Sequence, residues 1–149
     1  MTPALANSIL LLDSSIVVKW FRAEPGCERA RALRDGFVAG QWEICLSDLV
    51  LYETANALHY SGDFTLAEIT EYIESVIALE IPIELFDLFV LERALASSRQ
   101  YGIAIYDSYL VALAQHKQMI FVTDDNRLLR KMNGITNIVR LQDLAIPSK

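Results

Sequence analysis

Four carboxylates stand where an α/β chain can bring them together: Asp13, Glu53, Asp107 and Asp125. Clustered carboxylates repel one another and lose hydration, so a fold tolerates them mainly where a hard cation neutralises their charge. Oxygen ligands of this kind suit Mg²⁺, with Mn²⁺ as a substitute. The pattern therefore predicts a site for a divalent metal ion.

Three of these acids have a simpler explanation as helix caps. Asp13, Asp107 and either Asp124 or Asp125 lie near the start of an expected helix, where aspartate accepts hydrogen bonds from free backbone N–H groups. Glu53 lies in the middle of an expected helix, on the apolar stripe that should face the sheet. No lysine or arginine occurs between residues 34 and 93 to pair with it. A metal ion is the economical partner, and a distant arginine or a surface orientation of Glu53 are the alternatives.

Short polar side chains near the acids are suited to orienting ligand carboxylates or bound water, although each is also a common helix cap. The candidates for this orienting role are Ser14, Ser15, Asn56, Ser108, Thr123 and Asp124. His59 and His116 lie near expected helix ends without metal-ligand spacing, so we expect both on the surface.

The elements that must position these residues alternate between strands and helices. The apolar pattern predicts strands at 8–13, 42–47, 81–86, 119–123 and 137–141. It predicts helices around 19–21, after Pro25, and at 48–60, 65–79, 87–100, 106–117 and 126–132. We therefore expect an α/β fold with a mainly parallel sheet of about five strands, covered by helices on both faces. Ligands of such sheets bind beyond the carboxyl ends of the strands, where Asp13 and Asp125 fall.

Length and composition indicate one domain over residues 1–149. The two cysteines lack metal-ligand spacing and suit a reducing cytoplasm. The first residues carry no basic region, and their apolar run ends at Asp13, too short to cross a membrane. We therefore expect a cytoplasmic protein. A hydrophobic content of 53% also predicts apolar surface that a second chain covers, as in a homodimer or a tight complex.

Charge is distributed unevenly along the chain. Residues 35–92 carry twelve acidic groups and no basic ones, whereas residues 1–34 and 93–149 are net positive. A polyanion should therefore approach along the two ends, although such charges often mark only solvated helix faces. The candidate contacts are Arg29, Arg31, Arg34, Arg127, Arg130 and Lys131.

Four segments in order along the chain carry a family resemblance. They are LLDSS followed by VVKWF, YETANAL at 52–58, YDSYLVALA at 106–114 and FVTDDNRLL at 121–129. With these motifs the chain resembles PIN-domain nucleases, and specifically the VapC-like ribonuclease toxins of bacterial and archaeal toxin–antitoxin pairs. The resemblance places the family's acidic quartet on Asp13, Glu53, Asp107 and Asp125. The family's last motif has one acid two positions after threonine, whereas both Asp124 and Asp125 are acidic here, and the spacing from Thr123 favours Asp125.

The resemblance implies an Mg²⁺-dependent endoribonuclease. Asp13 and Asp107 would hold the ion, and Glu53 and Asp125 would complete the site or hold a second ion. A water activated by the metal would attack phosphorus and leave 5′-phosphate and 3′-hydroxyl ends. The resemblance also implies a small antitoxin whose basic side chain reaches the carboxylates. Two alternatives are an idle PIN-fold interaction module and an aspartate-based phosphoryl-transfer domain, which the serine at position 15 disfavours.

Overall fold

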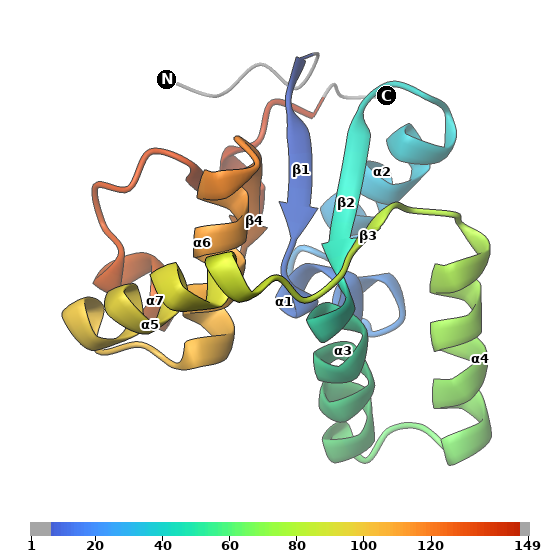
Figure 1. Ribbon diagram of the computed structural model, residues 1–149. Helices are drawn as coiled ribbons and strands as arrows, with labels where there is room; N and C mark the ends of the chain where they lie inside the picture. Colours follow the sequence, from blue (N-terminus) through green and yellow to red (C-terminus); the bar gives the residue numbers. More distant parts are fainter. Residues whose placement is uncertain (1–6, 147–149) are drawn as a thin grey trace.

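A five-stranded parallel sheet forms the centre of the computed structural model, which describes residues 7–146 (Figure 1). The strands are β1 (Ile9–Leu12), β2 (Glu43–Ser47), β3 (Ile83–Glu84), β4 (Ile120–Thr123) and β5 (Ile138–Arg140). The helices are α1 (Ser14–Val17), α2 (Cys27–Val38), α3 (Asp48–Ser61), α4 (Leu66–Ala78), α5 (Leu88–Tyr101), α6 (Ile105–His116) and α7 (Asn126–Lys131), with 3₁₀ turns η2 (Val18–Trp20) and η3 (Leu141–Asp143). The predicted α/β class and parallel sheet are confirmed. Residues 1–6, on which the expectation about a signal peptide rested, lie outside the described part.

Strand β1 lies in the middle of the sheet, whose order is β3-β2-β1-β4-β5. Leu10 pairs with Ile44 of β2 on one side and with Ile120 of β4 on the other. The chain therefore leaves β1 toward one half of the sheet and later returns to the other half. Such a reversal of direction opens a crevice at the carboxyl ends of the two central strands.

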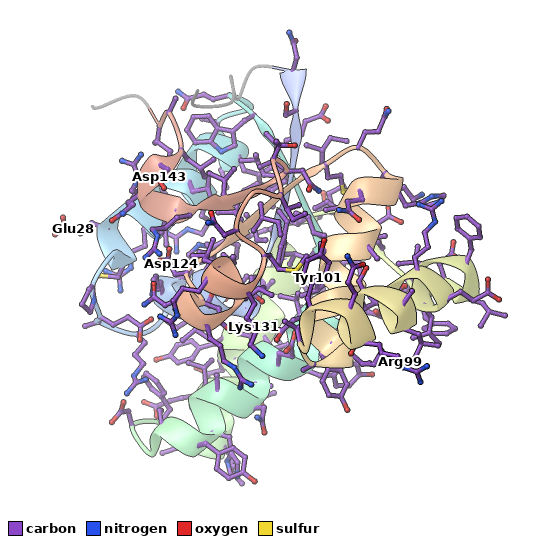
Figure 2. All side chains as sticks on the ribbon, turned by 90° about the vertical axis from the view of Figure 1, so that its left-hand side faces the viewer. Glu28, Arg99, Tyr101, Asp124, Lys131 and Asp143 are labelled. Atoms are coloured by element: carbon purple, nitrogen blue, oxygen red, sulfur yellow. The ribbon has the colours of Figure 1, made fainter. Side chains whose placement is uncertain are left out.

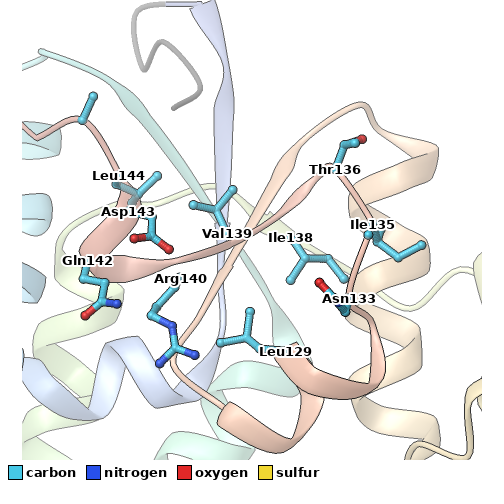
Figure 3. A pocket seen from close by; sticks show the side chains of 12 residues that line it. Leu129, Asn133, Ile135, Thr136, Ile138, Val139, Arg140, Gln142, Asp143 and Leu144 are labelled. Atoms are coloured by element: carbon cyan, nitrogen blue, oxygen red, sulfur yellow. The ribbon is translucent and has the colours of Figure 1, made fainter. Parts of the chain in front are cut away.

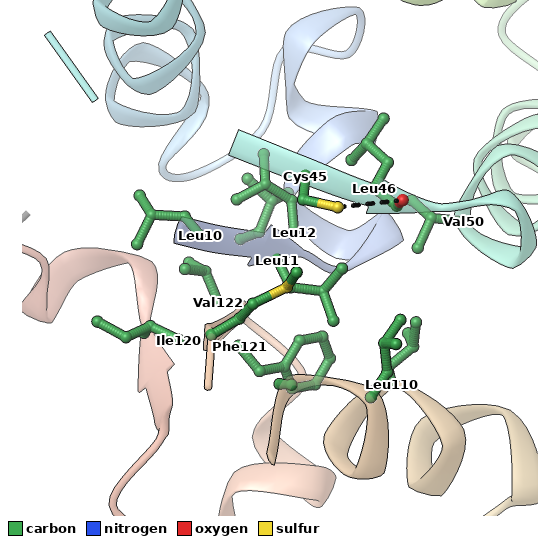
Figure 4. Close-up of a cluster of buried hydrophobic side chains, with 14 of the residues drawn as sticks. Leu10, Leu11, Leu12, Cys45, Leu46, Val50, Leu110, Ile120, Phe121 and Val122 are labelled. Atoms are coloured by element: carbon green, nitrogen blue, oxygen red, sulfur yellow. Dashed lines mark hydrogen bonds between the residues drawn. The ribbon is translucent and has the colours of Figure 1, made fainter. Parts of the chain in front are cut away.

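Helices cover both faces of the sheet, as the sequence predicted. Leu10, Leu11 and Leu12 point alternately to the two faces and all are fully buried. Residues of α6 such as Leu110 pack on one face, and α2 lies on the other (Figures 1 and 4). This packing holds the carboxyl ends of β1 and β4 in fixed positions.

Helix α3 begins directly after β2 and extends below the sheet beside α4 (Figure 1). Ser47 caps it by accepting a hydrogen bond from Leu49 N at 3.3 Å, and Gly62 ends it in the left-handed conformation. A small apolar cluster joins α3 to α4 and η2. Helix α3 thereby carries the predicted site residue Glu53 to the edge where β1 ends.

The strand expected at 81–86 is much shorter in the structure. Strand β3 contains only Ile83 and Glu84, and it pairs only with β2 at the edge of the sheet. Pro82 contributes its carbonyl, which accepts a hydrogen bond from Leu46 N at 3.0 Å, but it has no N–H to donate. A strand within the predicted range is confirmed, and its predicted length is wrong. No helix within residues 7–146 is both long and apolar enough to cross a membrane.

Gly36 of α2 packs directly against the ring of Trp42. A methyl group at residue 36 would lie 1.9 Å from the Trp42 ring, whose Nε1 is held by a 2.8 Å hydrogen bond to Leu33 O. We expect Gly36→Ala to lower the free energy of unfolding by about 2 kcal/mol, measured by urea denaturation, because the ring cannot move away. In a Trp42→Phe background, where the smaller ring leaves space, the cost of Gly36→Ala should shrink; an equal cost in both backgrounds would contradict this explanation.

Candidate active site

An acid-lined cavity of about 320 Å³ lies at the carboxyl ends of β1 and β4. We call it the acid pocket, and its carboxylates are those of Asp13, Glu24, Glu53, Asp107, Asp124 and Asp125. The four predicted acids come from four separate segments of the chain. Asp13 directly follows β1, Asp125 is the second residue after β4, Glu53 projects from α3, and Asp107 lies in the first turn of α6. The fold therefore brings all four to one cavity.

Asp13 is held rigidly at the floor of the acid pocket. It is only 5% exposed, and its Oδ1 accepts a hydrogen bond from Ser14 N at 2.8 Å. Its Oδ2 accepts hydrogen bonds from Ser15 Oγ at 2.8 Å and from Thr123 Oγ1 at 2.7 Å. Burial raises the pKa of Asp13, and the nearby charge of Asp125 adds to the rise, whereas these hydrogen bonds oppose it. Asp13 also caps α1, so the same side chain caps a helix and lines the acid pocket.

Glu53 points into the acid pocket from the middle of α3. Its Oε1 is buried and has no hydrogen-bond partner among residues 7–146. Burial raises the pKa of Glu53 to about 7, with further contributions from the charges of Asp13 and Asp107. A buried carboxylate oxygen without a donor is costly, and a cation is the partner that would satisfy it.

Asp107 faces the same carboxylates from α6. It lies in the first turn of this helix, but Ala104 is the N-cap residue, so the cap explanation does not apply to Asp107. Burial raises its pKa to about 6, followed by the charges of Asp13 and Asp125, while Arg127 lowers it. Its carboxylate receives no hydrogen bond from the described residues that would restrain it.

The two adjacent aspartates after β4 take different positions. Asp124 turns toward η2 and η3, where Oδ1 accepts a hydrogen bond from Leu141 N at 3.2 Å and Oδ2 lies 3.7 Å from Lys19 Nζ. Asp125 caps α7 through Oδ1, and its charge raises the pKa of both Asp13 and Asp107. Asp125 is thus the member of the pair that acts on the other carboxylates, in line with the spacing from Thr123.

The predicted polar residues divide into two groups. Thr123 and Ser15 bond directly to Asp13, and Ser14 contributes its backbone N–H. Ser108 and Asn56 do not reach the pocket. The Ser108 hydroxyl donates to Ala94 O at 2.6 Å and joins α6 to α5. Asn56 is exposed and does not line the pocket; the residue one turn after Glu53 that does line it is Ala57.

Most of the residues predicted to contact RNA form hydrogen bonds or ion pairs within the protein. Arg29 donates to Leu141 O and Leu144 O, and Arg34 pairs with Asp35 at 2.9 Å. Lys131 donates to Gly102 O at the end of α5 (Figure 2). Arg130 and Arg127 are exposed, and Arg127 is the candidate whose charge acts on Asp107. Arg31 donates to Trp20 O at 3.3 Å. Both histidines are exposed, as expected.

Two charged residues of the acid pocket were not predicted, Lys19 and Glu24. Lys19 is 8% exposed, and its Nζ lies 2.8 Å from Glu24 Oε1. A signal for Lys19 was present, since it lies among Val17, Val18 and Trp20 in an apolar run, and a buried lysine needs an acidic partner.

The donor set of the acid pocket fits a hard divalent cation, although the side chains are not closed around one. Within residues 7–146, no three His, Cys, Asp or Glu side chains form a group that could hold an ion as they stand. Glu53 Oε1 and the carboxylate of Asp107 have no hydrogen bond that would compete with an ion, whereas Asp13 is already held by hydrogen bonds. Carboxylate oxygens of this kind are the ligands that Mg²⁺ and Mn²⁺ prefer.

Comparisons with known proteins agree with this architecture. The family model described as the PIN domain matches residues 10–134. A toxin–antitoxin complex from Klebsiella pneumoniae has a similar fold, with 17% identity over 89% of this chain and 97% of the other, and a TM-score of 0.66. No curated protein matches the sequence.

Two further solved structures share the fold. VapC20 of Mycobacterium tuberculosis, a sarcin–ricin loop cleaving toxin, is 13% identical over 81% of this chain and 93% of its own, with a TM-score of 0.63. VapBC2 from Rickettsia felis, bound to a promoter DNA fragment, is 18% identical over 89% of this chain and 96% of the other, with a TM-score of 0.64. The family match covers most of the chain and both central strands with the acids that follow them. The chain belongs to the PIN domain family.

Proposed function

We propose that this protein is an Mg²⁺-dependent endoribonuclease and the toxin of a cytoplasmic toxin–antitoxin pair. One observation carries the proposal: in a PIN domain, four acids from separate segments line one cavity at the carboxyl ends of β1 and β4. The structural neighbours lend support, since they include a toxin–antitoxin complex and a toxin that cleaves the sarcin–ricin loop.

Asp13 and Asp107 would hold the magnesium ion, and Glu53 and Asp125 would complete its surroundings. When bound, Mg²⁺ lowers the pKa of a water molecule and stabilises negative charge on the departing oxygen of the phosphodiester. Ser15 and Thr123 hold Asp13 in place through its Oδ2. Lys19 lies close to both Glu24 and Asp124, so it offsets part of the charge that these two acids would add to the repulsion in the pocket.

Cleavage of RNA by the purified chain tests this function directly. We expect a single-stranded RNA to be cut with Mg²⁺ or Mn²⁺ and to stay intact in EDTA, with 5′-phosphate and 3′-hydroxyl product ends. An idle interaction module, the main alternative, would bind partners but cut no RNA under any metal condition. Incorporation of label from a phosphoryl donor would instead indicate the phosphoryl-transfer alternative.

An apolar groove beside the acid pocket suits the segment of an antitoxin. The groove has a volume of about 260 Å³ and lies between α3, α6 and the segment before α5. Its lining includes Tyr52 and Tyr106, which directly precede Glu53 and Asp107 in the chain. A peptide with an apolar anchor in the groove could extend a basic side chain to the carboxylates, which is the arrangement expected of an antitoxin.

A homodimer would cover the apolar surface that the composition predicted. Leu88 and Leu95 are 63% and 52% exposed and lie on the same face of α5, two turns apart. We expect the wild-type chain to elute as a dimer in light-scattering chromatography and Leu88→Glu/Leu95→Glu to elute as a monomer, because four buried charges per dimer would oppose association. Leu66→Glu on α4, an equally exposed leucine, should leave the dimer intact. A monomeric wild-type chain would contradict the homodimer.

A further inference from the structure

A second cavity shares a wall with the acid pocket. It has a volume of about 430 Å³, and Lys19, Glu24 and Asp124 line both cavities. Its other side chains include Arg29 of α2 and Arg140 at the end of β5. We call this second cavity the basic cavity. A molecule that extends from the acid pocket across the shared wall would therefore enter it.

The charges in the basic cavity favour an anion. Lys19 Nζ lies 2.8 Å from Glu24 Oε1 and 3.7 Å from Asp124 Oδ2, so one ammonium group offsets half of the formal charge of the two acids. The guanidinium groups of Arg29 and Arg140 remain as positive charge. Both are positioned by the fold, because Arg29 Nε donates to Leu141 O at 2.9 Å and Arg140 Nη1 donates to Asn126 Oδ1 at 2.6 Å.

The opposite side of the acid pocket disfavours a polyanion. It is formed by α3 and the segment before α5, which belong to the stretch 35–92 with twelve acidic groups and no basic ones. The groove on that side is apolar apart from Asp48. A strand of phosphodiesters that enters the acid pocket would therefore meet repulsion toward α3 and attraction toward β5.

We propose that the basic cavity holds the phosphodiester backbone of the RNA strand next to the bond that is cut. The inference rests on the proposed nuclease function and deepens it by giving the strand a direction across the site. It assigns Arg140 to this backbone contact. It also gives Arg29, one of the predicted RNA contacts, a place at the site, while Arg34 and Lys131 have none.

Gln142 offers a clean way to change the charge of the basic cavity. It lines this cavity and its side chain is exposed, extending from η3 on the same side as Arg140 (Figure 3). No catalytic or metal-binding role falls on it, and no hydrogen bond among the described residues depends on its side chain. Gln41, an exposed glutamine before the start of β2, lies at the opposite end of the strands from the acid pocket and is the matched control.

The test measures binding of a fluorescent single-stranded RNA by anisotropy in EDTA, together with the KM for cleavage in Mg²⁺. Gln142→Lys should tighten binding about threefold and Gln142→Glu should weaken it about threefold, as expected for one charge about 6 Å from a phosphate in water. The slope of log K against log salt should become steeper by about 0.7 in Gln142→Lys. KM should move in the same direction as the dissociation constant.

Gln41→Lys and Gln41→Glu should leave the affinity, the salt slope and KM unchanged. If the Gln142 variants match the Gln41 variants while the wild-type chain still cuts RNA, the backbone path is wrong and the nuclease function stands. If the wild-type chain neither binds nor cuts RNA, both proposals fall. The two failures are therefore distinguishable in one set of measurements.

Discussion

Replacing Asp107 by asparagine is expected to reduce metal-dependent RNA cleavage by about a thousandfold or more. The change removes one of the two carboxylates proposed to hold the ion, and the ion supplies most of the charge stabilisation in such reactions. Asp107 is the best residue for this test because its carboxylate receives no hydrogen bond from the described residues, so its loss should leave the fold intact. The measurement is kcat/KM for a single-stranded RNA in Mg²⁺.

Two controls separate chemistry from folding in this experiment. Asp143→Asn makes the same chemical change at an exposed carboxylate that does not line the acid pocket and should keep full activity. The melting temperature of Asp107→Asn in EDTA should not fall below that of the wild-type chain, because the variant removes a repelling charge. Asp13→Asn is less clean, since an amide in place of Oδ2 would face the hydroxyl groups of Ser15 and Thr123. Activity of Asp107→Asn within tenfold of wild type would refute the assignment.

The second large expected effect is on the melting temperature, which should depend on pH and on the presence of a divalent metal ion. The pKa values of Glu53 and Asp107 are raised to about 7 and about 6 in the folded chain, and that of Asp13 is also raised. The folded state therefore holds protons that the unfolded state has released. By linkage, the stabilising contribution of these protons is present at low pH and is lost as the pH rises through the folded values. Without divalent ions, the melting temperature should fall between pH 5 and pH 8.

Magnesium should reverse this loss at high pH. Ions bind the ionised carboxylates of the folded state, and an ion concentration about 100 times its dissociation constant adds roughly 2.7 kcal/mol, or about 5–10 °C in a chain of this size. The same addition at pH 5 should have a much smaller effect, because protons then compete for the oxygens. Thermal melts at both pH values, with EDTA or Mg²⁺, measure the difference.

A double variant provides the comparison for these melts. In Glu53→Gln/Asp107→Asn two of the pocket acids with raised pKa values no longer titrate, so the dependence on pH between 5 and 8 should weaken and the effect of Mg²⁺ should nearly disappear. The exposed histidines are unchanged in both proteins and cancel in the comparison. Two results together would contradict the proposed acid site. The melting temperature of the wild-type chain in EDTA would rise from pH 5 to pH 8, and Mg²⁺ would raise it no more in the wild-type chain than in the variant.

Asp124 shows how tertiary structure separates neighbours that the sequence presents as equivalent. Both acids of the DD pair follow β4, and both line the acid pocket. Asp124 is drawn toward Lys19 and Leu141 N, which lie far from it in the chain, whereas Asp125 stays with α7 and acts on Asp13 and Asp107. Spacing from Thr123 favoured Asp125, but the reason for the difference is a lysine more than a hundred residues away.

Local pattern alone was sufficient for most of the architecture and for the four central acids. Alternating apolar runs and helix caps depend on neighbouring residues, so the positions of β1, β2, α3 and α6 could be predicted to within a residue or two. The acids after β1 and β4 follow from the rule that parallel strands end at one edge. Glu53 was recognisable because a charge on an apolar stripe needs a partner.

Contacts between distant segments decided the rest. The length of β3 depends on a single pairing with β2, the inward position of Lys19 depends on Glu24 and Asp124, and the bond of Ser108 depends on Ala94 in α5. The basic cavity likewise joins α2, the segment after β4 and the end of β5. Spacing along a chain specifies which face of an element a side chain occupies, but only packing specifies which other element that face meets.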